Sequence, residues 1–237
     1  MNRHLIAVAT LTLSCAAAVA SASAETRPVV VELFTSQGCS SCPPADAVLA
    51  ELAARKDVLA LGFHVDYWDS LGWKDPLSTP GATGRQNEYA AEFGRHEVFT
   101  PQIVVDGQRQ AVGSNRNAVL QAISDSKLAL AEPTSAAPIA FAADGRSVAI
   151  GAGSGQGKVL VIRYIRSRTT QVQRGENAGR TAVDVNGVES FRTAGEWTGR
   201  KMEFPIDPVD ADHGLAVVVQ GADGRILGAA ALSTAQS

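Results

Sequence analysis

The sequence predicts an α/β domain over residues 25–131, followed by an all-β sandwich domain over residues 139–237. In the first range, apolar β-branched runs typical of buried strands alternate with stretches of helical spacing. In the second range, short strand-like runs recur around Asp-Gly and Asn-Gly dipeptides, which mark tight hairpins. The intervening residues 132–138 contain proline, serine and threonine and have the composition of a linker.

The first domain is expected to contain the elements β-α-β, α, β-β, α in that order. The Asp106-Gly107 dipeptide predicts the hairpin, and Ser114 is expected to cap the last helix. The expected elements are strand Val29–Phe34, helix Pro44–Arg55, strand Val58–Val65, an irregular stretch over 66–84, a helix around Arg85–Phe93, strands Gln102–Val105 and Gln110–Val112, and a final helix after Ser114.

The second domain is expected to contain roughly eight short strands, the number typical of a sandwich. Its most unusual loop, Arg174–Gly179, is expected to form a hydrogen-bonded turn in preference to a partner site. Asp210, Asp212 and His213 are expected in a solvated loop in preference to a cation site. The expected strands include Ile139–Ala143, Ser147–Ile150, Val159–Ile165, Thr181–Val185, Glu189–Thr193, Leu215–Gln220 and Ile226–Ala231, with turns at Asp144-Gly145, Asn186-Gly187 and Asp223-Gly224.

The N-terminus predicts a secretory signal peptide over residues 1–24, and hence a periplasmic or secreted protein. A basic start, a short apolar core and an Ala-Ser-Ala exit are its features. Cleavage would remove Arg3 and Cys15, leaving 21 − 1 = 20 basic against 24 acidic residues. That balance, without a basic tract, disfavours nucleic acid as a partner. No other apolar run approaches ~20 residues, so no membrane span is expected after signal removal.

Two cysteines remain in the mature chain, Cys39 and Cys42, and they predict a dithiol redox centre. A structural disulfide spanning two residues would constrain the unfolded chain little, and zinc would need further ligands that are absent at suitable spacing. A helix start favours the thiolate, the reactive form, and the second sulfur can resolve a mixed disulfide. We therefore expect a solvent-accessible dithiol, and no cofactor besides the redox-active Cys39–Cys42 disulfide.

Several strings resemble known families. The Cys39–Cys42 motif with Thr100-Pro101 resembles the thioredoxin superfamily. Longer strings resemble a bacterial family of secreted, functionally uncharacterised thioredoxin-like proteins, domain-of-unknown-function family 1223. These strings are Glu32–Asp46, His64–Trp68, Leu71–Asp75 and Arg174–Gly179. The resemblance implies a thioredoxin-like fold for the first domain, with two parallel strands and an antiparallel third, so that the dithiol, residues 64–68 and residues 100–101 meet at one sheet edge.

The resemblance also implies roles. Cys39 would be the nucleophile, Cys42 the resolving thiol and Pro101 a cis-proline facing them. Glu32, a costly carboxylate in an apolar strand, would relay protons to Cys42; the alternative is an ion pair with a neighbour such as Arg109 or Lys74. With a threonine, Thr100, before this proline, the chain resembles disulfide isomerases at this position.

One departure concerns the start of the first helix. Thioredoxins usually begin this helix at the first cysteine, whereas here Pro43 and Pro44 follow the second. Proline suits a first helical turn but disfavours α geometry in the residue before it. Cys42 is therefore expected to be the cap, with Cys39 in the loop, where the helix stabilises its thiolate less.

Five further side chains are candidates at the same edge. Tyr67, Trp68 and Trp73 would bind an extended substrate segment together with Thr100, or would form a small satellite core. His64 is expected to be a hydrogen-bonded strand-end histidine, in preference to a base or a metal ligand. Asp66 either orients His64 or caps the loop.

The function predicted from the sequence is an exported thiol–disulfide oxidoreductase acting on protein or small thiols, recharged by a redox partner that the sequence does not identify. One alternative is a periplasmic copper carrier using Cys39, Cys42 and His64, because thiolates suit Cu(I). Another is a non-catalytic partner-binding module presented by the β domain.

Overall fold

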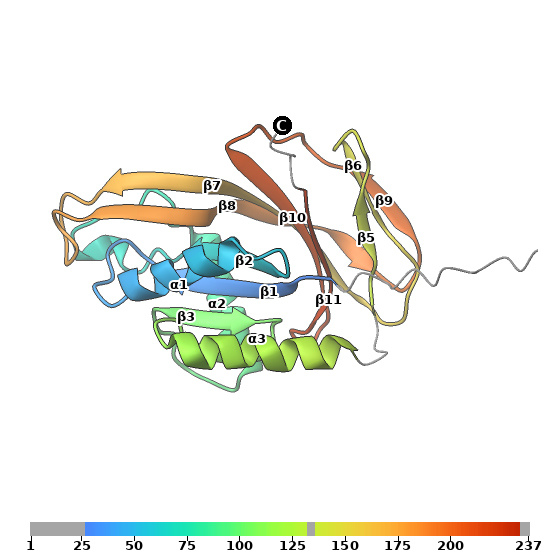
Figure 1. Cartoon of the computed structure of the whole chain (residues 1–237), viewed down its shortest axis with the longest axis horizontal. Coiled ribbons are helices and arrows are strands. Elements are labelled where there is room, and N and C mark those ends of the chain that lie inside the picture. Colours follow the sequence, from blue (N-terminus) through green and yellow to red (C-terminus); the bar gives the residue numbers. More distant parts are fainter. Residues whose placement is uncertain (1–26, 132–135, 233–237) are drawn as a thin grey trace, which may run out of the picture.

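The computed structural model describes residues 27–131 and 136–232. The expected signal peptide, with Cys15, and residues 132–135 of the expected linker lie outside these ranges. The described residues form an eight-stranded mixed sheet, a three-stranded sheet and three α-helices (Figure 1). No helix among them is long and apolar enough to cross a membrane.

The first half has the expected order of elements. Strand β1 pairs in parallel with β2 and antiparallel with β3, and β3 pairs with β4. These elements are β1 (Val29–Thr35), α1 (Pro43–Ala53), β2 (Val58–His64), a 3-10 turn (Asp69–Leu71), α2 (Pro80–Glu92), β3 (Gln102–Val105), β4 (Arg109–Val112) and α3 (Arg116–Ala131).

Two helix starts differ from the prediction. Helix α2 begins five residues earlier than expected because the Thr79 side chain accepts a hydrogen bond from the Ala82 N–H, and Pro80 suits the first turn. Helix α3 begins at Arg116, and the Asn115 side chain accepts from the Ala118 N–H at 3.2 Å. Ser114 is therefore not the cap.

The second half extends the first sheet, which the sequence did not indicate. The large sheet has the order β11-β10-β7-β8-β2-β1-β3-β4, and the small one β5-β6-β9. Two β layers face each other only where the small sheet covers part of the large one. The elements are β5 (Ile139–Phe141), β6 (Ser147–Ile150), β7 (Gly157–Gln171), β8 (Thr181–Trp197), β9 (Met202–Pro205), β10 (His213–Gln220) and β11 (Ile226–Leu232).

The predicted turn at Asn186-Gly187 is wrong, because both residues lie inside the continuous strand β8. Gly187 pairs with Gly62 of β2, and a Cβ on Gly187 would lie 2.7 Å from Leu77. Asn186 has φ +49°, and its amide donates to the Ala60 carbonyl at 2.9 Å. The small Gly187 and the left-handed backbone of Asn186 mark the place where β8 approaches β2 and joins the two halves.

Three apolar clusters fill the molecule. Helices α1 and α3 cover one face of the first four strands, and α2 covers the other. The cluster beneath α2 also contains residues from β7, β8, β10 and β11, so both halves share it. The third cluster lies between the small sheet and the outer strands of the large one.

Candidate functional site

The two cysteines form a disulfide in the loop between β1 and α1, with an S–S distance of 2.12 Å. As predicted, Cys42 is the N-cap of α1 and Cys39 lies before the helix. Pro43 and Pro44 carry no N–H, and the first helical N–H, of Ala45, donates to the Cys42 carbonyl at 2.8 Å. The helix start therefore presents few free donors to a sulfur anion.

One hydroxyl takes the place of those donors, and a second lies beside the same sulfur and donates to the Thr100 carbonyl at 3.5 Å. The Thr100 hydroxyl donates to Cys39 Sγ at 3.4 Å, and Ser41 Oγ lies 3.4 Å from the same sulfur. The Trp68 indole N–H donates to Thr100 Oγ1 at 2.8 Å, which leaves the threonine proton free to point at the sulfur. The Thr100–Pro101 peptide is cis, as the resemblance implied.

The disulfide is not open to solvent, so the expectation of an accessible pair is wrong for this state. Cys39 and Cys42 are both 0% exposed, although Ser40 and Ser41 between them are exposed. The loop that joins β7 to β8 holds this segment. The Asn177 amide donates to the Gln37 and Cys39 carbonyls at 2.9 and 2.8 Å.

The neighbouring Glu176 carboxylate accepts from the Ser40 N–H at 3.1 Å. The expected turn in this loop is present, since the Ala178 N–H donates to the Gly175 carbonyl at 3.2 Å. The loop also has a second role that the sequence did not indicate, because it binds three backbone groups of the cysteine segment.

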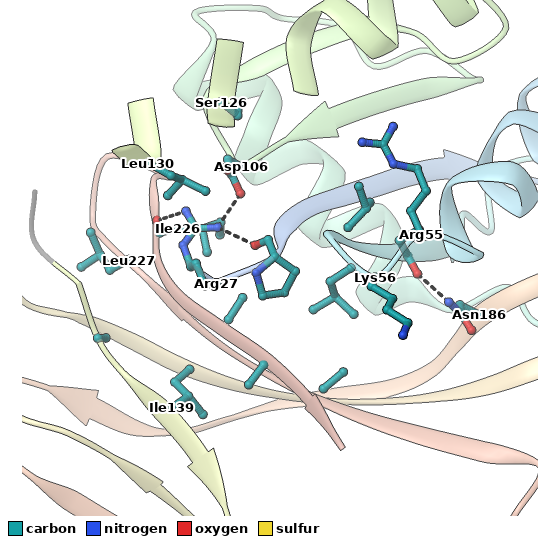
Figure 2. Close-up of a pocket in the computed structure, with 18 of the residues that line it drawn as sticks. Arg27, Arg55, Lys56, Asp106, Ser126, Leu130, Ile139, Asn186, Ile226 and Leu227 are labelled. Atoms are coloured by element: carbon teal, nitrogen blue, oxygen red, sulfur yellow. Dashed lines mark hydrogen bonds and ion pairs between the residues drawn. The ribbon is translucent and has the colours of Figure 1, made fainter. Parts of the chain in front are cut away.

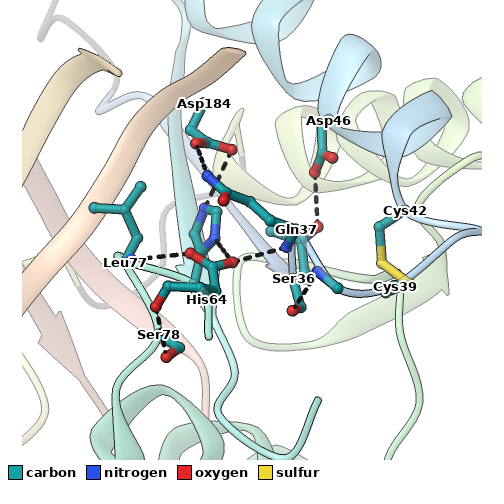
Figure 3. Close-up of polar contacts among 12 residues, drawn as sticks. Ser36, Gln37, Cys39, Cys42, Asp46, His64, Leu77, Ser78 and Asp184 are labelled. Atoms are coloured by element: carbon teal, nitrogen blue, oxygen red, sulfur yellow. Dashed lines mark hydrogen bonds and ion pairs between the residues drawn. A yellow bond between two sulfur atoms is a disulfide. The ribbon is translucent and has the colours of Figure 1, made fainter. Parts of the chain in front are cut away.

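Beneath the cysteine segment lies a buried polar network around His64 (Figure 3). The His64 ring pairs through Nδ1 with Asp75 at 2.7 Å and through Nε2 with Asp184 at 3.8 Å. Gln37 bridges the two carboxylates: its N–H donates to Asp75 and its side-chain amide to Asp184, both at 2.7 Å. The disulfide loop is thus fixed to elements from both halves of the chain.

This network confirms the prediction of a hydrogen-bonded histidine and identifies its partners. Asp66, a candidate for orienting His64, instead accepts from the Thr83 hydroxyl at 2.6 Å. Asp75 and Asp184 were not singled out from the sequence, because Asp75 lies in an irregular loop and Asp184 in the second half.

Electrostatics favour a charged histidine. Burial alone would lower the His64 pKa, but the Asp75 charge and hydrogen bond, with Asp184 and Asp46, outweigh it and raise the pKa to about 9. Burial raises the pKa of Asp46 to about 6, against the hydrogen bond that the Thr35 hydroxyl donates at 2.7 Å. Burial likewise raises the pKa of Asp184.

Glu32 belongs to a different network. It lies on the α2 side of β1, where its carboxylate is ion-paired with Arg85 and accepts from the Tyr89 hydroxyl at 2.6 Å. Gln220 of β10 donates to the same hydroxyl at 3.1 Å. The ion pair expected as the alternative to a proton relay therefore exists, but the proposed partners Arg109 and Lys74 are wrong.

Two of the three aromatic candidates, Trp68 and Trp73, contact the disulfide loop, and Tyr67 lies beside Trp68. Trp68 packs beside Gly38, because a Cβ added to Gly38 would lie 3.4 Å from the Trp68 side chain. The Trp73 indole donates to the Gln37 side chain at 3.0 Å, and the Tyr67 hydroxyl to Gln86 at 3.2 Å. Tyr67 and Trp68 also pack against the core cluster under α2, which matches the satellite-core alternative. Their binding of a substrate remains a prediction.

No group of three or more histidine, cysteine, aspartate or glutamate side chains in the described part of the chain is arranged to hold a metal ion. A cavity of about 1440 Å³ lies away from the disulfide, and none of the site residues lines it. Arg27 lines this cavity, and its guanidinium points toward Asp106 and Ile226 (Figure 2). It donates to Asp106 at 2.8 Å and to the Ile226 carbonyl at 2.7 Å.

The fold and site define a class: a mixed α/β protein with a buried Cys-x-x-Cys disulfide beside a cis-proline. Residues 30–220 match the model of a family described as "Protein of unknown function (DUF1223)", and the chain belongs to that family.

The crystal structure of an Agrobacterium tumefaciens protein is similar, with a TM-score of 0.74 and 32% identity over 90% of this chain and 97% of that one. HBP35 of Porphyromonas gingivalis has a TM-score of 0.52 and 15% identity, covering 90% of this chain and 76% of its own, which shows a likeness of fold alone. No curated protein matches the chain.

Proposed function

We propose that the protein is an exported, thioredoxin-like thiol–disulfide oxidoreductase that acts on protein or small thiols through Cys39 and Cys42. The observation that carries the proposal is the environment of Cys39 Sγ, which two hydroxyls contact beside cis-Pro101. Hydroxyl donors stabilise a thiolate more than a thiol, so they favour the form that exchanges. A disulfide needed only as a staple has no use for such donors.

The exchange step conserves atoms and electrons. A substrate thiolate attacks Cys39 Sγ, a new S–S bond forms, and the Cys39–Cys42 bond breaks with its electron pair on Cys42. A second substrate thiol then attacks the mixed disulfide and releases Cys39 as a thiolate. The substrate loses two electrons, which the protein holds as two thiols, and the reverse sequence reduces a substrate disulfide.

Asp46 is better placed than Glu32 to take the proton of Cys42. It follows Cys42 by four residues on α1, the spacing at which helical side chains are neighbours. Its pKa of about 6, raised by burial, allows proton exchange near neutral pH. Glu32, by contrast, is engaged by Arg85 and Tyr89 on the other face of the sheet.

The test begins with the reduced protein. Alkylation of Cys39 by iodoacetamide should follow a thiolate pKa below the ordinary ~8.5, and the protein should catalyse insulin reduction or the oxidation of a reduced protein. Cys42→Ser should accumulate a mixed disulfide, whereas Cys39→Ser should not. A Cys39 thiol no more reactive than free cysteine, with no catalysed exchange, would overturn the proposal.

The direction of electron flow follows from the reduction potential. A value near ~−270 mV would indicate a reductant and one near ~−120 mV an oxidant. Export is tested separately, by fractionating cells that express the full chain and sequencing the N-terminus of the mature protein, which should begin at Glu25.

The copper-carrier alternative finds no support in the site. The His64 ring is bound by Asp75 and lies near Asp184. With a pKa raised to about 9, it is protonated at neutral pH and carries no lone pair for a metal.

A further inference from the structure

The buried disulfide raises a problem of access that the second half of the chain answers. We define the hairpin tip as residues 172–180, which join β7 to β8. Asn177 at this tip is itself 5% exposed, and its amide is hydrogen-bonded to the backbone of the cysteine segment. Two backbone carbonyls of the cysteine segment are therefore held by a part of the chain about 140 positions away in sequence.

We propose that Asn177 and Glu176 determine which thiols reach the disulfide, because a substrate must displace them before it attacks Cys39. This inference rests on the proposed function and names the access step of the same site. Asn177 occupies two backbone carbonyls, those of Gln37 and Cys39, and Glu176 occupies the Ser40 N–H.

Displacement of the two contact residues does not require the strand ladder to open. Val172 and Arg180 close the hairpin with a 2.9 Å backbone hydrogen bond, so the ladder stays intact below the tip. Gly175 and Gly179 flank the two contact residues at φ +76° and +84°, conformations that glycine enters without strain. Gly175 rests on Trp73, so displacement of the tip also uncovers that indole.

The groups uncovered by this movement indicate a class of substrate. Two carbonyl acceptors and one N–H donor would be left without partners in a partly buried place, which is costly unless the incoming molecule satisfies them. A polypeptide segment offers N–H donors and a carbonyl acceptor along its backbone, in the manner of strand addition. The small thiol 2-mercaptoethanol offers one hydroxyl, which cannot satisfy all three groups. The site should therefore accept cysteines in peptides and discriminate against small thiols.

The experiment measures how fast the oxidised full-length protein is reduced. Wild type, Asn177→Ala and Glu176→Ala are treated with excess phosphine reductant, and the free thiols are trapped with time. Glu176 is exposed, so its variant keeps the fold even if Asn177→Ala weakens it. Asn186→Gly is the matched control. It removes a similar amide-to-carbonyl bond of β8 away from the disulfide and tolerates the positive φ.

Asn177→Ala should be reduced roughly tenfold faster or more, Glu176→Ala several-fold faster, and Asn186→Gly at the wild-type rate. A second measurement compares a short cysteine-containing peptide with 2-mercaptoethanol at equal thiolate concentration. Wild type should be reduced faster by the peptide than by 2-mercaptoethanol. Asn177→Ala should lower the ratio of these two rates.

Unchanged reduction rates in both tip variants while they remain folded would overturn the proposal, as would a wild-type preference for 2-mercaptoethanol. If the tip variants accelerate reduction as expected and yet the protein catalyses no exchange, the access role stands and the oxidoreductase function fails.

Discussion

At the scale of single residues, the hydroxyl of Thr100 is the group that most directly tunes Cys39. It donates to the sulfur and is itself oriented by Trp68. We expect Thr100→Val, which keeps the shape and removes the hydroxyl, to raise the Cys39 thiol pKa in the reduced protein by about 1 unit, the worth of one hydrogen bond to a charged group. The pH dependence of iodoacetamide alkylation measures this shift.

Thr100→Ser is the matched variant, because it keeps a hydroxyl within reach and should retain the wild-type alkylation profile. Trp68→Phe should give an intermediate profile, since it removes the donor that orients the hydroxyl and leaves the hydroxyl in place. An identical thiol pKa in wild type and Thr100→Val would show that the contact does not tune the sulfur.

We expect the folded protein to lose stability at alkaline pH as His64 loses its proton. Its folded pKa of about 9 exceeds the ordinary 6.5, so its contribution is complete below pH 6.5 and disappears as pH rises through 9. At 1.36 kcal/mol per pKa unit, the loss is on the order of 3 kcal/mol. Urea unfolding of the oxidised protein between pH 6 and 10 measures it.

His64→Gln should be less stable at pH 6 but should show little further loss up to pH 10. His96→Gln, which changes an exposed histidine, should keep the wild-type profile. A wild-type unfolding free energy that stays constant from pH 6 to pH 10 would contradict a charged, ion-paired His64.

At the scale of elements, β1 and α2 are connected through the buried Glu32–Arg85 pair. We expect Arg85→Met to cost about 3–5 kcal/mol, because it leaves the Glu32 carboxylate buried without its cation. The double variant Glu32→Leu with Arg85→Met should regain most of this loss, since two apolar side chains carry no desolvation penalty. Urea unfolding measures both.

Arg116 provides the surface comparison, because its ion pair with Glu51 has side chains 50% and 47% exposed. Arg116→Ala should cost no more than about 1 kcal/mol. If Arg85→Met costs as little as Arg116→Ala, the buried pair does not hold α2 against the sheet.

The elements of the first half could be predicted from the sequence because each has a local cause. Strand β1 is a β-branched run, and α1 begins with a proline pair, so their observed bounds differ from the expected ones by no more than two residues. The wrong prediction of a turn within β8 also has a local cause. Asn-Gly commonly forms a hairpin turn, but here the pair lies within the strand, beside Ala60 and Gly62 of β2. Such a tertiary contact leaves no local signal.

The site was predictable to the same extent. The cysteines, cis-Pro101, Thr100 and Trp68 lie in strings of recognisable spacing. Asp184 and Asn177 reach the site only through the pairing of β7 with β8 and of β8 with β2, which sequence spacing does not specify. The unusual composition of the Arg174–Gly179 loop was the one signal that pointed toward Asn177.

At the scale of the whole molecule, the two halves share one sheet and one core cluster. Val30, Phe34 and Leu61 pack in the same cluster as Ile162 and Val218. We expect residues 25–131 expressed alone to bind a hydrophobic dye and to unfold without a cooperative transition, because this apolar surface would be exposed to water. Circular dichroism with urea and dye fluorescence measure it.

The full mature chain serves as the reference and should unfold in one transition seen equally by both probes. A cooperative, dye-free fragment would show that the first half is an independent domain, as the sequence alone predicts. The full chain would then be expected to unfold in two steps.

Arg27 gives this shared architecture a consequence for biosynthesis. Its guanidinium donates both to Asp106 and to the carbonyl of Ile226, so its full set of partners exists only when a segment synthesised nearly two hundred residues later is present. A nascent polypeptide therefore cannot complete its native structure while it is still emerging from the ribosome. Delayed folding of this kind keeps the chain extended, as the export proposed above would require of a precursor that crosses a membrane channel unfolded.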